Sequence, residues 1–167
     1  MSNGRGKPTG LIADADVLID YVQGDKAVLA LISRHVAALH VASPVLEEVH
    51  ELSASEAQQL GIVIVEPTLI QVLEAAGGEG STSFQDRLCL ILARDSGWVV
   101  FSNDNALRSA CSNVNIPCLW GMEAMAILVD QNYLTGKRAM SVTLKMARSN
   151  TFITQSVLDR FRRRIGL

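Results

Sequence analysis

The chain has 167 residues, of which 49% are hydrophobic, and its formal net charge at neutral pH is only −2. This length suits one domain with a sizeable core, and the hydrophobic content excludes a disordered chain. The longest apolar runs are far too short to span a membrane, and the polar, glycine-rich residues 1–10 contain no apolar segment of a signal peptide. We therefore expect a cytoplasmic domain without membrane contact, preceded by a flexible leader at residues 1–10.

Alternating apolar runs and turn signals predict strands at residues 11–13, 39–42, 61–65, 98–101 and 116–119. Helical periodicity and capping residues predict helices at residues 17–23, 25–37, 44–52, 68–76, 84–95, 105–111, 120–131, 133–148 and 155–164. Strands that alternate with helices are typical of a parallel sheet covered on both faces. We predict an α/β fold, a three-layer α/β/α sandwich over residues 11–119, followed by a helical extension at residues 120–167.

The cysteines and histidines do not suggest a metal site or a disulfide framework. Their spacing matches no zinc motif, and the number of cysteines is odd. The residues are Cys89, Cys111 and Cys118, and His35, His40 and His50. Buried thiols in a reducing compartment are the expectation for the cysteines.

Two aspartates, Asp14 and Asp16, follow the first expected strand with one alanine between them. In an extended backbone alternate side chains share a face, so both carboxylates are expected to point the same way. Carboxylates in an apolar setting need a compensating charge, and a divalent cation is the simplest one. Asp20 follows on the next expected helix, where it is expected to face solvent.

Three more acids lie at positions where a carboxylate can serve a site. Glu48 borders the apolar stripe of the helix at residues 44–52, whereas Glu47 points to solvent. Asp86 lies on the packed side of an apolar helix, which is unusual for a carboxylate, although it could serve only as a negative charge at the helix N-terminus. Asp104 follows the strand at residues 98–101.

These acids have a plausible common location. In parallel sheets, ligands bind outside the carboxyl ends of the strands, where Asp14 and Asp104 are expected. Glu48 and Asp86 open helices whose first turns can face the same edge. Oxygen ligands of this kind suit Mg²⁺ or Mn²⁺.

The C-terminal end is strongly basic. Residues 1–136 hold 7 Lys/Arg and 16 Asp/Glu, a net charge of −9, whereas residues 137–167 hold 8 Lys/Arg and one acid, a net charge of +7. Either a polyanionic partner or a solvated helix face explains this asymmetry. The candidate phosphate-binding residues are Arg160, Arg162, Arg163 and Arg164. The aromatic residues Trp120, Phe152 and Phe161 do not interleave with the basic residues, so we expect them in the core or an interface.

Four acidic motifs follow one another in a fixed order: Asp14 after an apolar strand, Val-Leu-Glu-Glu-Val with Glu48, Ser-Phe-Gln-Asp-Arg-Leu with Asp86, and Phe-Ser-Asn-Asp-Asn-Ala-Leu with Asp104. This order and spacing resemble those of PIN-domain ribonucleases over residues 11–119. The sequences at residues 119–128 and 152–161 resemble a PIN subgroup with a helical extension. Asp16 departs from the family pattern, which has Asn, Ser or Thr there, and the adjacent Glu47 and Glu48 leave the second motif ambiguous by one residue.

The resemblance implies cleavage of single-stranded RNA by a metal-activated water molecule. Asp14, Asp86 and Asp104 would bind Mg²⁺ or Mn²⁺, with Asp16 as a further candidate ligand, and Glu48 would orient or deprotonate the water. It further implies the toxin of a toxin–antitoxin pair, which a small antitoxin protein holds inactive. Self-association into a homodimer is an additional expectation.

Two other functions remain open. The sequence Asp14-Ala-Asp16-Val17-Leu18 partly fits a haloacid-dehalogenase-like phosphatase, with Asp14 as nucleophile and Asp16 as acid and base. The later aspartate pair of that family is missing, because Asp130 and Asp159 are isolated. The third hypothesis is a PIN-like module that binds nucleic acid or protein without cleaving it.

Overall fold

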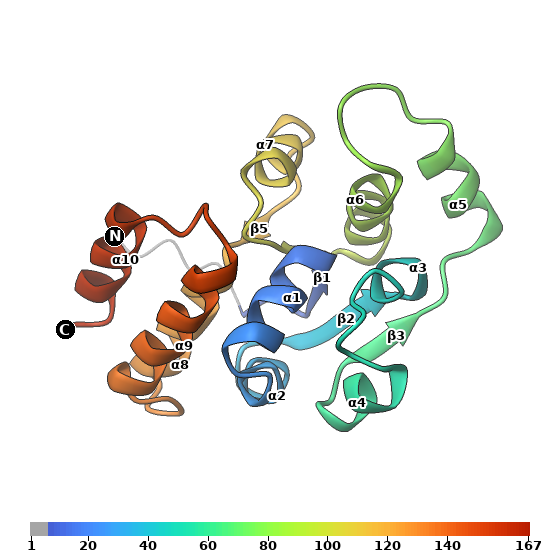
Figure 1. Ribbon diagram of the computed structural model, residues 1–167. Coiled ribbons are helices and arrows are strands. Elements are labelled where there is room, and N and C mark those ends of the chain that lie inside the picture. Colours follow the sequence, from blue (N-terminus) through green and yellow to red (C-terminus); the bar gives the residue numbers. More distant parts are fainter. Residues whose placement is uncertain (1–6) are drawn as a thin grey trace.

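A five-stranded parallel sheet forms the centre of the protein, as a computed structural model that describes residues 7–167 shows (Figure 1). Its strands, in the order β3-β2-β1-β4-β5, pair in parallel throughout. They are β1 (Gly10–Ala13), β2 (Ala38–Ala42), β3 (Val63–Val65), β4 (Val99–Phe101) and β5 (Cys118–Leu119). The order of connection reverses between β1 and β4. Such a reversal opens a crevice at the carboxyl ends of the two strands, where α/β proteins bind ligands.

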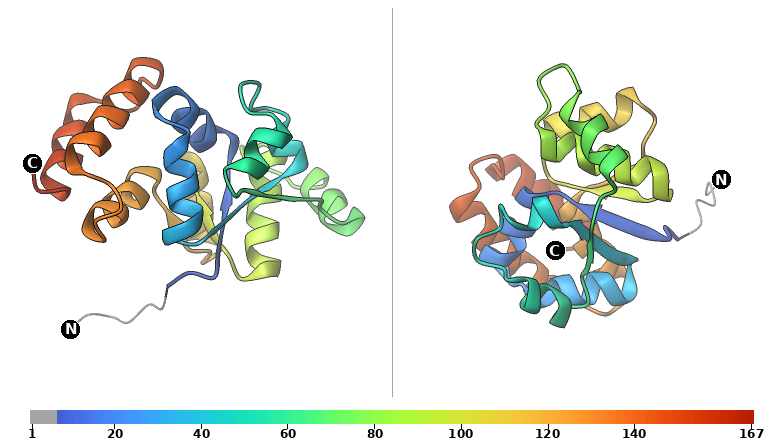
Figure 2. Two further views of the ribbon diagram at one scale, coloured as in Figure 1. Left: turned by 90° about the horizontal axis from the view of Figure 1, so that it is seen from below. Right: turned by 90° about the vertical axis from the view of Figure 1, so that its right-hand side faces the viewer.

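Helices cover both faces of this sheet. Figure 1 and Figure 2 show α5, α6 and α7 on one side, and α1, α2 and α4 on the other. The helices of residues 7–167 are α1 (Ala15–Gly24), α2 (Ala27–His35), α3 (Ser43–Leu46), α4 (Ala54–Gln59), α5 (Leu69–Ala76), α6 (Phe84–Ser96), α7 (Asn105–Asn113), α8 (Gly121–Asp130), α9 (Gly136–Ser149) and α10 (Gln155–Arg164). The predicted three-layer α/β/α architecture is confirmed. Of the helices described, none is long and apolar enough to cross a membrane.

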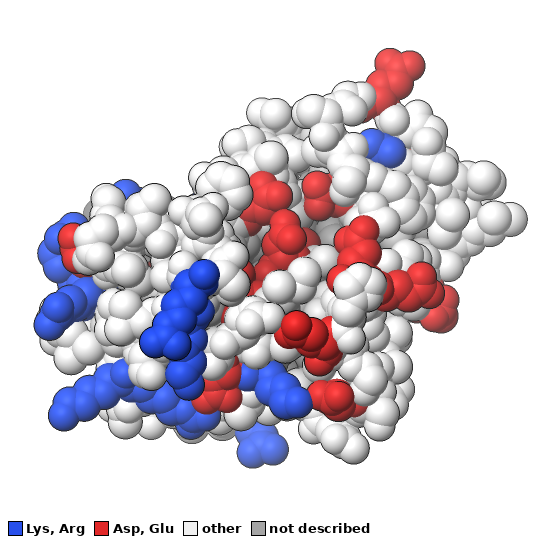
Figure 3. Space-filling view, in the orientation of Figure 1, with Lys and Arg blue, Asp and Glu red and all other residues white. Residues whose placement is uncertain are grey.

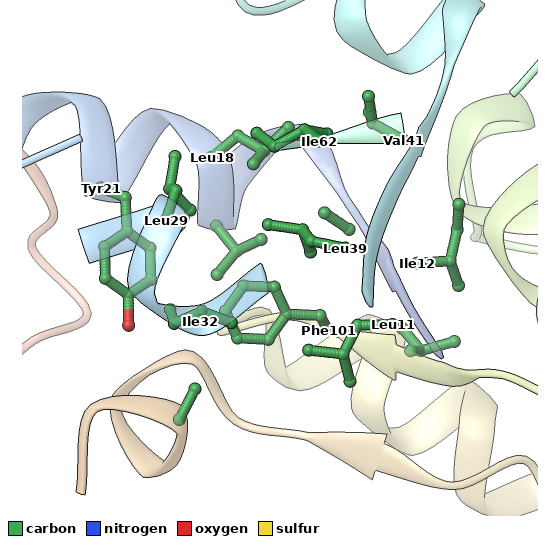
Figure 4. Close-up of a cluster of buried hydrophobic side chains, with 14 of the residues drawn as sticks. Leu11, Ile12, Leu18, Tyr21, Leu29, Ile32, Leu39, Val41, Ile62 and Phe101 are labelled. Atoms are coloured by element: carbon green, nitrogen blue, oxygen red, sulfur yellow. The ribbon is translucent and has the colours of Figure 1, made fainter. Parts of the chain in front are cut away.

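The core covers both faces of the sheet and continues into the helical extension. Figure 4 shows part of it, with labelled side chains from β1, β2, β4, α1 and α2 and with Ile62, the residue before β3. Within it the rings of Tyr21 and Phe101 stack with their centroids 6.1 Å apart. The buried hydroxyl of Tyr21 donates to the carbonyl oxygen of Gly121 at 2.6 Å, so it ties the first helix to the start of the extension.

The helical extension packs directly onto the core. Helix α9 lies along α1, and α8 lies against α2. The contact is close at Gly24, where an added Cβ would lie 2.9 Å from Cγ1 of Val142. A side chain there would push α9 away, and this explains a glycine at the end of α1. The extension therefore has a fixed position beside the carboxyl edge of the sheet.

Two predictions about local structure were wrong, and one helix was missed. The expected helix at residues 44–52 ends at Leu46, because the following residues form tight turns with hydrogen bonds between residues three apart. These turns still bury Val49 and Leu52, so the apolar spacing did not require a helix. Helix α4 was not predicted, since its polar sequence buries only Ala57. The leader was expected to extend to residue 10, but Gly10 already belongs to β1, and residues 1–6 lie outside the described part.

Candidate active site

Asp14 lies at the centre of the carboxyl edge, directly after β1. It is the N-cap of α1, and its Oδ1 accepts from the backbone N–H of Val17 at 2.8 Å. Its Oδ2 accepts a hydrogen bond from the hydroxyl of Ser102, the first residue after β4. The side chain of Asp14 is nearly enclosed, with 4% of its surface exposed. The first turn of α1 and the residue after β4 therefore fix the two oxygens of this carboxylate.

Ser102 connects Asp14 to the second strand-end acid. Its Oγ accepts from the backbone N–H of Asp104 at 2.9 Å while its proton points to Asp14. Asp104 is the N-cap of α7, and its Oδ1 accepts from the N–H of Ala106 at 2.7 Å. Sequence reasoning missed Ser102 as a site residue, although its place between β4 and the Asn-Asp pair was a usable signal.

The other acids join Asp14 around a small cavity. Asp16, Glu48 and Asp86 line this cavity of about 120 Å³ together with Asp14, and Glu47 is not among its lining residues. The buried thiol of Cys89 lines it too and donates to the carbonyl oxygen of Ala13 at 3.6 Å. Asp104 borders a second, adjoining cavity, which Asp16 also lines. The structure thus brings together the acids that the sequence placed at one edge.

Asp16 reaches this position by a route that the sequence did not suggest. The expectation that Asp14 and Asp16 share a face of an extended strand was wrong, because the strand ends at Ala13. Asp14 caps the helix, and Asp16 lies in its first turn, exposed at the rim of the site. Asp86 similarly lies in the first turn of α6, where its backbone N–H donates to the capping hydroxyl of Ser83 at 3.1 Å.

Burial and mutual repulsion make these carboxyl groups hard to ionise. Burial raises the pKa of Asp14 from 3.8 to about 8, against the hydrogen bonds from Ser102 and Val17, with a smaller contribution from the charges of Asp16 and Asp86. Partial burial is also the main cause that raises the pKa of Asp16, and the charge of Asp104 adds to it. The pKa of Asp86 is raised by partial burial and then by the charges of Asp104 and Asp16.

Glu48 belongs to the same electrostatic group although it is exposed. Its pKa is raised, first by partial loss of solvent and then by the charges of Asp16 and Asp86, while His50 opposes the shift. Each acid that raises the pKa of another lies close enough to repel it through a partly desolvated medium. The group Asp14, Asp16, Glu48, Asp86 and Asp104 is called the carboxylate cluster below.

The carboxylate cluster lacks a cationic partner among residues 7–167, since the ion pairs there involve other acids. In Figure 3 the acidic side chains gather in the hollow at the centre of the face. No three Asp, Glu, His or Cys side chains of the described chain stand ready to hold one ion directly. Mg²⁺ keeps several of its water molecules in protein sites, so carboxylates at this spacing suit an ion bound partly through water.

Comparisons with protein-family models, with curated proteins and with solved structures gave no match. The function must therefore be inferred from the chemistry of the carboxylate cluster and its surroundings. The resemblance to PIN-domain ribonucleases remains an interpretation of the sequence motifs.

A second buried carboxylate, Asp20, lies beneath the rim. It was expected to face solvent, but only 4% of its surface is exposed. Its Oδ2 accepts from Nδ2 of Asn103 at 2.9 Å, and both of its oxygens accept from Nδ2 of Asn150, at 3.1 and 3.0 Å. The Oδ1 of Asn103 in turn accepts from the N–H of Gly121 at 2.8 Å. Asp20 thus connects α1, the loop after β4 and the end of α9.

Replacing Asp20 with alanine should destabilise the protein by about 1–3 kcal/mol, because the amide nitrogens of Asn103 and Asn150 lose the oxygens to which they donate. Urea unfolding at neutral pH would measure this loss. Asp159→Ala, on the exposed face of α10, is the matched control and should change stability by less than about 0.5 kcal/mol. Equal stability of the two variants would show that the buried network contributes nothing.

Two C-terminal side chains have surroundings that the sequence did not indicate. The guanidinium of Arg164 pairs with Glu123 and Asp130, each at 2.8 Å, so its charge is already offset within the protein. Phe152 is not a core residue, since 82% of its surface is exposed. Phe161 is buried as expected, and Trp120 is half-buried beneath the guanidinium of Arg108. Arg160, Arg162 and Arg163 are exposed.

Proposed function

We propose that this chain is a metal-dependent endoribonuclease that cleaves single-stranded RNA. The observation that supports the proposal most strongly is the carboxylate cluster, whose members repel one another and form no ion pair within the described residues. A site built only of carboxylates repels a phosphodiester unless a divalent cation lies between them. The motif resemblance supports RNA, and single strands in particular, as the substrate.

The metal would be Mg²⁺ or Mn²⁺, held by Asp14, Asp86 and Asp104, with Asp16 as a further candidate ligand. When bound, it supplies charge neutralisation at the phosphate and a lowered pKa for a bound water molecule. Ser102 holds Asp14 in one orientation through its hydroxyl, which leaves little freedom for this carboxylate to turn away. Asp104 is likewise fixed by the N–H groups at the start of α7.

Glu48 would take a proton from the attacking water. It reaches the cavity from the turn after α3, and its side chain is exposed to solvent. Partial loss of solvent and then the charges of Asp16 and Asp86 raise its pKa, and this makes its carboxylate a better proton acceptor than a free glutamate. Glu48 thus differs from Asp14, whose oxygens are both engaged.

The same contacts argue against the phosphatase alternative. A nucleophilic aspartate needs an oxygen that can approach phosphorus in line, but one oxygen of Asp14 accepts from Val17 and the other from Ser102. Asp14 is also almost fully enclosed. A carboxylate in such a position is better suited to metal binding than to attack.

The proposal is tested with purified protein, single-stranded RNA, structured RNA and a simple phosphomonoester, each with Mn²⁺ or with chelator. We expect cleavage of single-stranded RNA in Mn²⁺, none in chelator and no turnover of the monoester. Turnover of the monoester alone would support the phosphatase instead. Retention of RNA without cleavage would leave a binding module.

The motif resemblance also leads us to propose a cytoplasmic toxin of a toxin–antitoxin pair, with a small antitoxin protein as partner and a homodimer as its assembly. Growth arrest on expression in bacteria, relieved by Asp104→Asn, would support the toxin role. Normal growth with active protein present in the cells would contradict it.

A further inference from the structure

A larger cavity of about 520 Å³ adjoins the carboxylate cluster. Asp16 and Asp104 lie on one side of it, and the loop of residues 149–152 lies on the other. Phe152 belongs to this wall, and its ring is the most exposed large hydrophobic side chain of the described chain. An aromatic face open to solvent therefore lines the same cavity as two of the acids that would lie near a phosphate.

The buried polar network holds the backbone of Phe152. Its N–H donates to Oδ1 of Asn150 at 3.0 Å, while the amide nitrogen of Asn150 donates to Asp20. Asp20 also holds Asn103, the residue before Asp104. The position of the Phe152 backbone is thus linked to the strand-end loop that carries a predicted metal ligand. A backbone that is already ordered loses little further entropy when a ligand binds.

A basic stripe leads to the same loop along α9. Lys137, Ser141, Lys145 and Arg148 follow one another on one exposed face, over about 16 Å of helix. None of these three cations pairs with an acid within residues 7–167. In Figure 3 a run of basic side chains lies over α9 and ends beside the central acidic hollow.

We propose that Phe152 is a base-stacking platform for single-stranded RNA and that Lys145 and Arg148 bind the phosphates that follow along α9. This inference deepens the proposed function and rests on it. A nucleotide carries two groups that suit this cavity. Its anionic phosphate suits a metal ion held near Asp16 and Asp104, and its planar base suits the ring of Phe152. The stripe then continues the path for the negatively charged backbone.

The test uses fluorescence anisotropy with a labelled oligouridylate and with an oligomer of the same length that carries the sugar–phosphate backbone without bases. Ca²⁺ replaces Mn²⁺ during binding, and a gel checks that the probe stays intact. Phe152→Ala should weaken binding of the oligouridylate by about 5- to 100-fold and leave the base-free oligomer unchanged. Phe152→Trp should retain binding, because it keeps an aromatic face.

The basic stripe has a different signature. The double variant Lys145→Ala, Arg148→Ala should weaken both oligomers and lower the slope of log affinity against log salt by about 1.4. Ile70→Ala is the control, because it removes an exposed apolar side chain from α5 and should change neither probe. The stacking role would be overturned if Phe152→Ala weakened binding of both oligomers equally or of neither.

The outcome is separable from that of the proposed function. Base-dependent binding through Phe152 without cleavage in Mn²⁺ would support the platform and refute the nuclease. Cleavage in Mn²⁺ with unchanged affinity in Phe152→Ala would refute the platform and support the nuclease.

Discussion

Replacing Asp86 with asparagine should lower Mn²⁺-dependent RNA cleavage by more than about 100-fold. Substitution of a residue that only hydrogen-bonds to a metal ligand already lowers metal affinity or activity by about 10- to 100-fold, and Asp86 is proposed to bind the metal itself. Asp86 lies in the first turn of α6 and lines the small cavity with Asp14. The amide keeps the size of the side chain but loses its charge. Single-turnover cleavage of a labelled single-stranded RNA would measure the effect.

The same substitution should make the metal-free protein more stable. Partial burial and the charges of Asp104 and Asp16 raise the pKa of Asp86, so its ionised form opposes folding. A neutral side chain removes this repulsion, and a gain of about 1 kcal/mol would raise the melting temperature by about 2–4 °C in a chain of this size. Loss of activity together with a gain in stability is the signature of a site selected for function.

The adjacent glutamates provide a matched pair of controls. Glu48→Gln should lower the rate by about 10²- to 10⁴-fold, because it removes the proposed proton acceptor. Glu47→Gln, one residue earlier and absent from the cavity lining, should change neither the rate nor the stability. If Asp86→Asn retains full activity, or if Glu47→Gln loses as much as Glu48→Gln, the assignment of these residues is wrong.

The strand-end acids were predictable because two independent signals agree. The apolar sequences before Asp14 and Asp104 identify buried strands, and parallel strands end at the same edge of a sheet. The capping serine before Asp86 fixed the start of α6 and hence the turn that carries this residue. Local sequence and fold class together were sufficient to place these three side chains near one another.

The charge of Asp20 predicted an exposed side chain, whereas its helical spacing from apolar residues indicated a buried one. Val17, Asp20, Tyr21 and Gly24 are all buried along one face of α1. What makes this burial tolerable is a pair of amides, Asn103 and Asn150, which lie 83 and 130 residues away in the sequence. Periodicity can flag such a position, but only the tertiary structure reveals the donors that satisfy it.

The exposure of Phe152 is the converse case, an apolar side chain that lies outside the core. Apolar character favours burial on average, and the residue lies between two helices that both contribute to the core. Its side chain points outward, and its backbone is held by Asn150 at the end of α9. A local hydrogen bond to Asn150, which is itself held by Asp20 130 residues earlier, thus accompanies the exposure of a side chain that apolar character alone assigns to the interior.

The stability of the metal-free protein should fall as the pH rises from about 4 to about 8. Burial raises the pKa of Asp14 in the folded protein to about 8, from 3.8 in the unfolded chain. Below both values the group is protonated in either state, and the full stability is present. Between them the unfolded chain releases a proton that the folded protein keeps, so each pH unit costs up to about 1.4 kcal/mol. Above about pH 8 both states are ionised and the loss ends.

Urea unfolding in chelator across this pH range would measure the slope, and Asp14→Asn isolates its source. The variant should lose most of the pH dependence. The part that remains comes from Asp16, Asp20, Glu48 and Asp86, whose pKa values are also raised. Excess Mn²⁺ should remove the loss in the parent protein, because the metal binds the ionised carboxylates of the folded state only. A metal-free protein that is as stable at pH 8 as at pH 5 would contradict the buried, uncompensated state of Asp14. If the pH dependence is present but Mn²⁺ leaves it unchanged, the cluster repels as described and yet holds no metal.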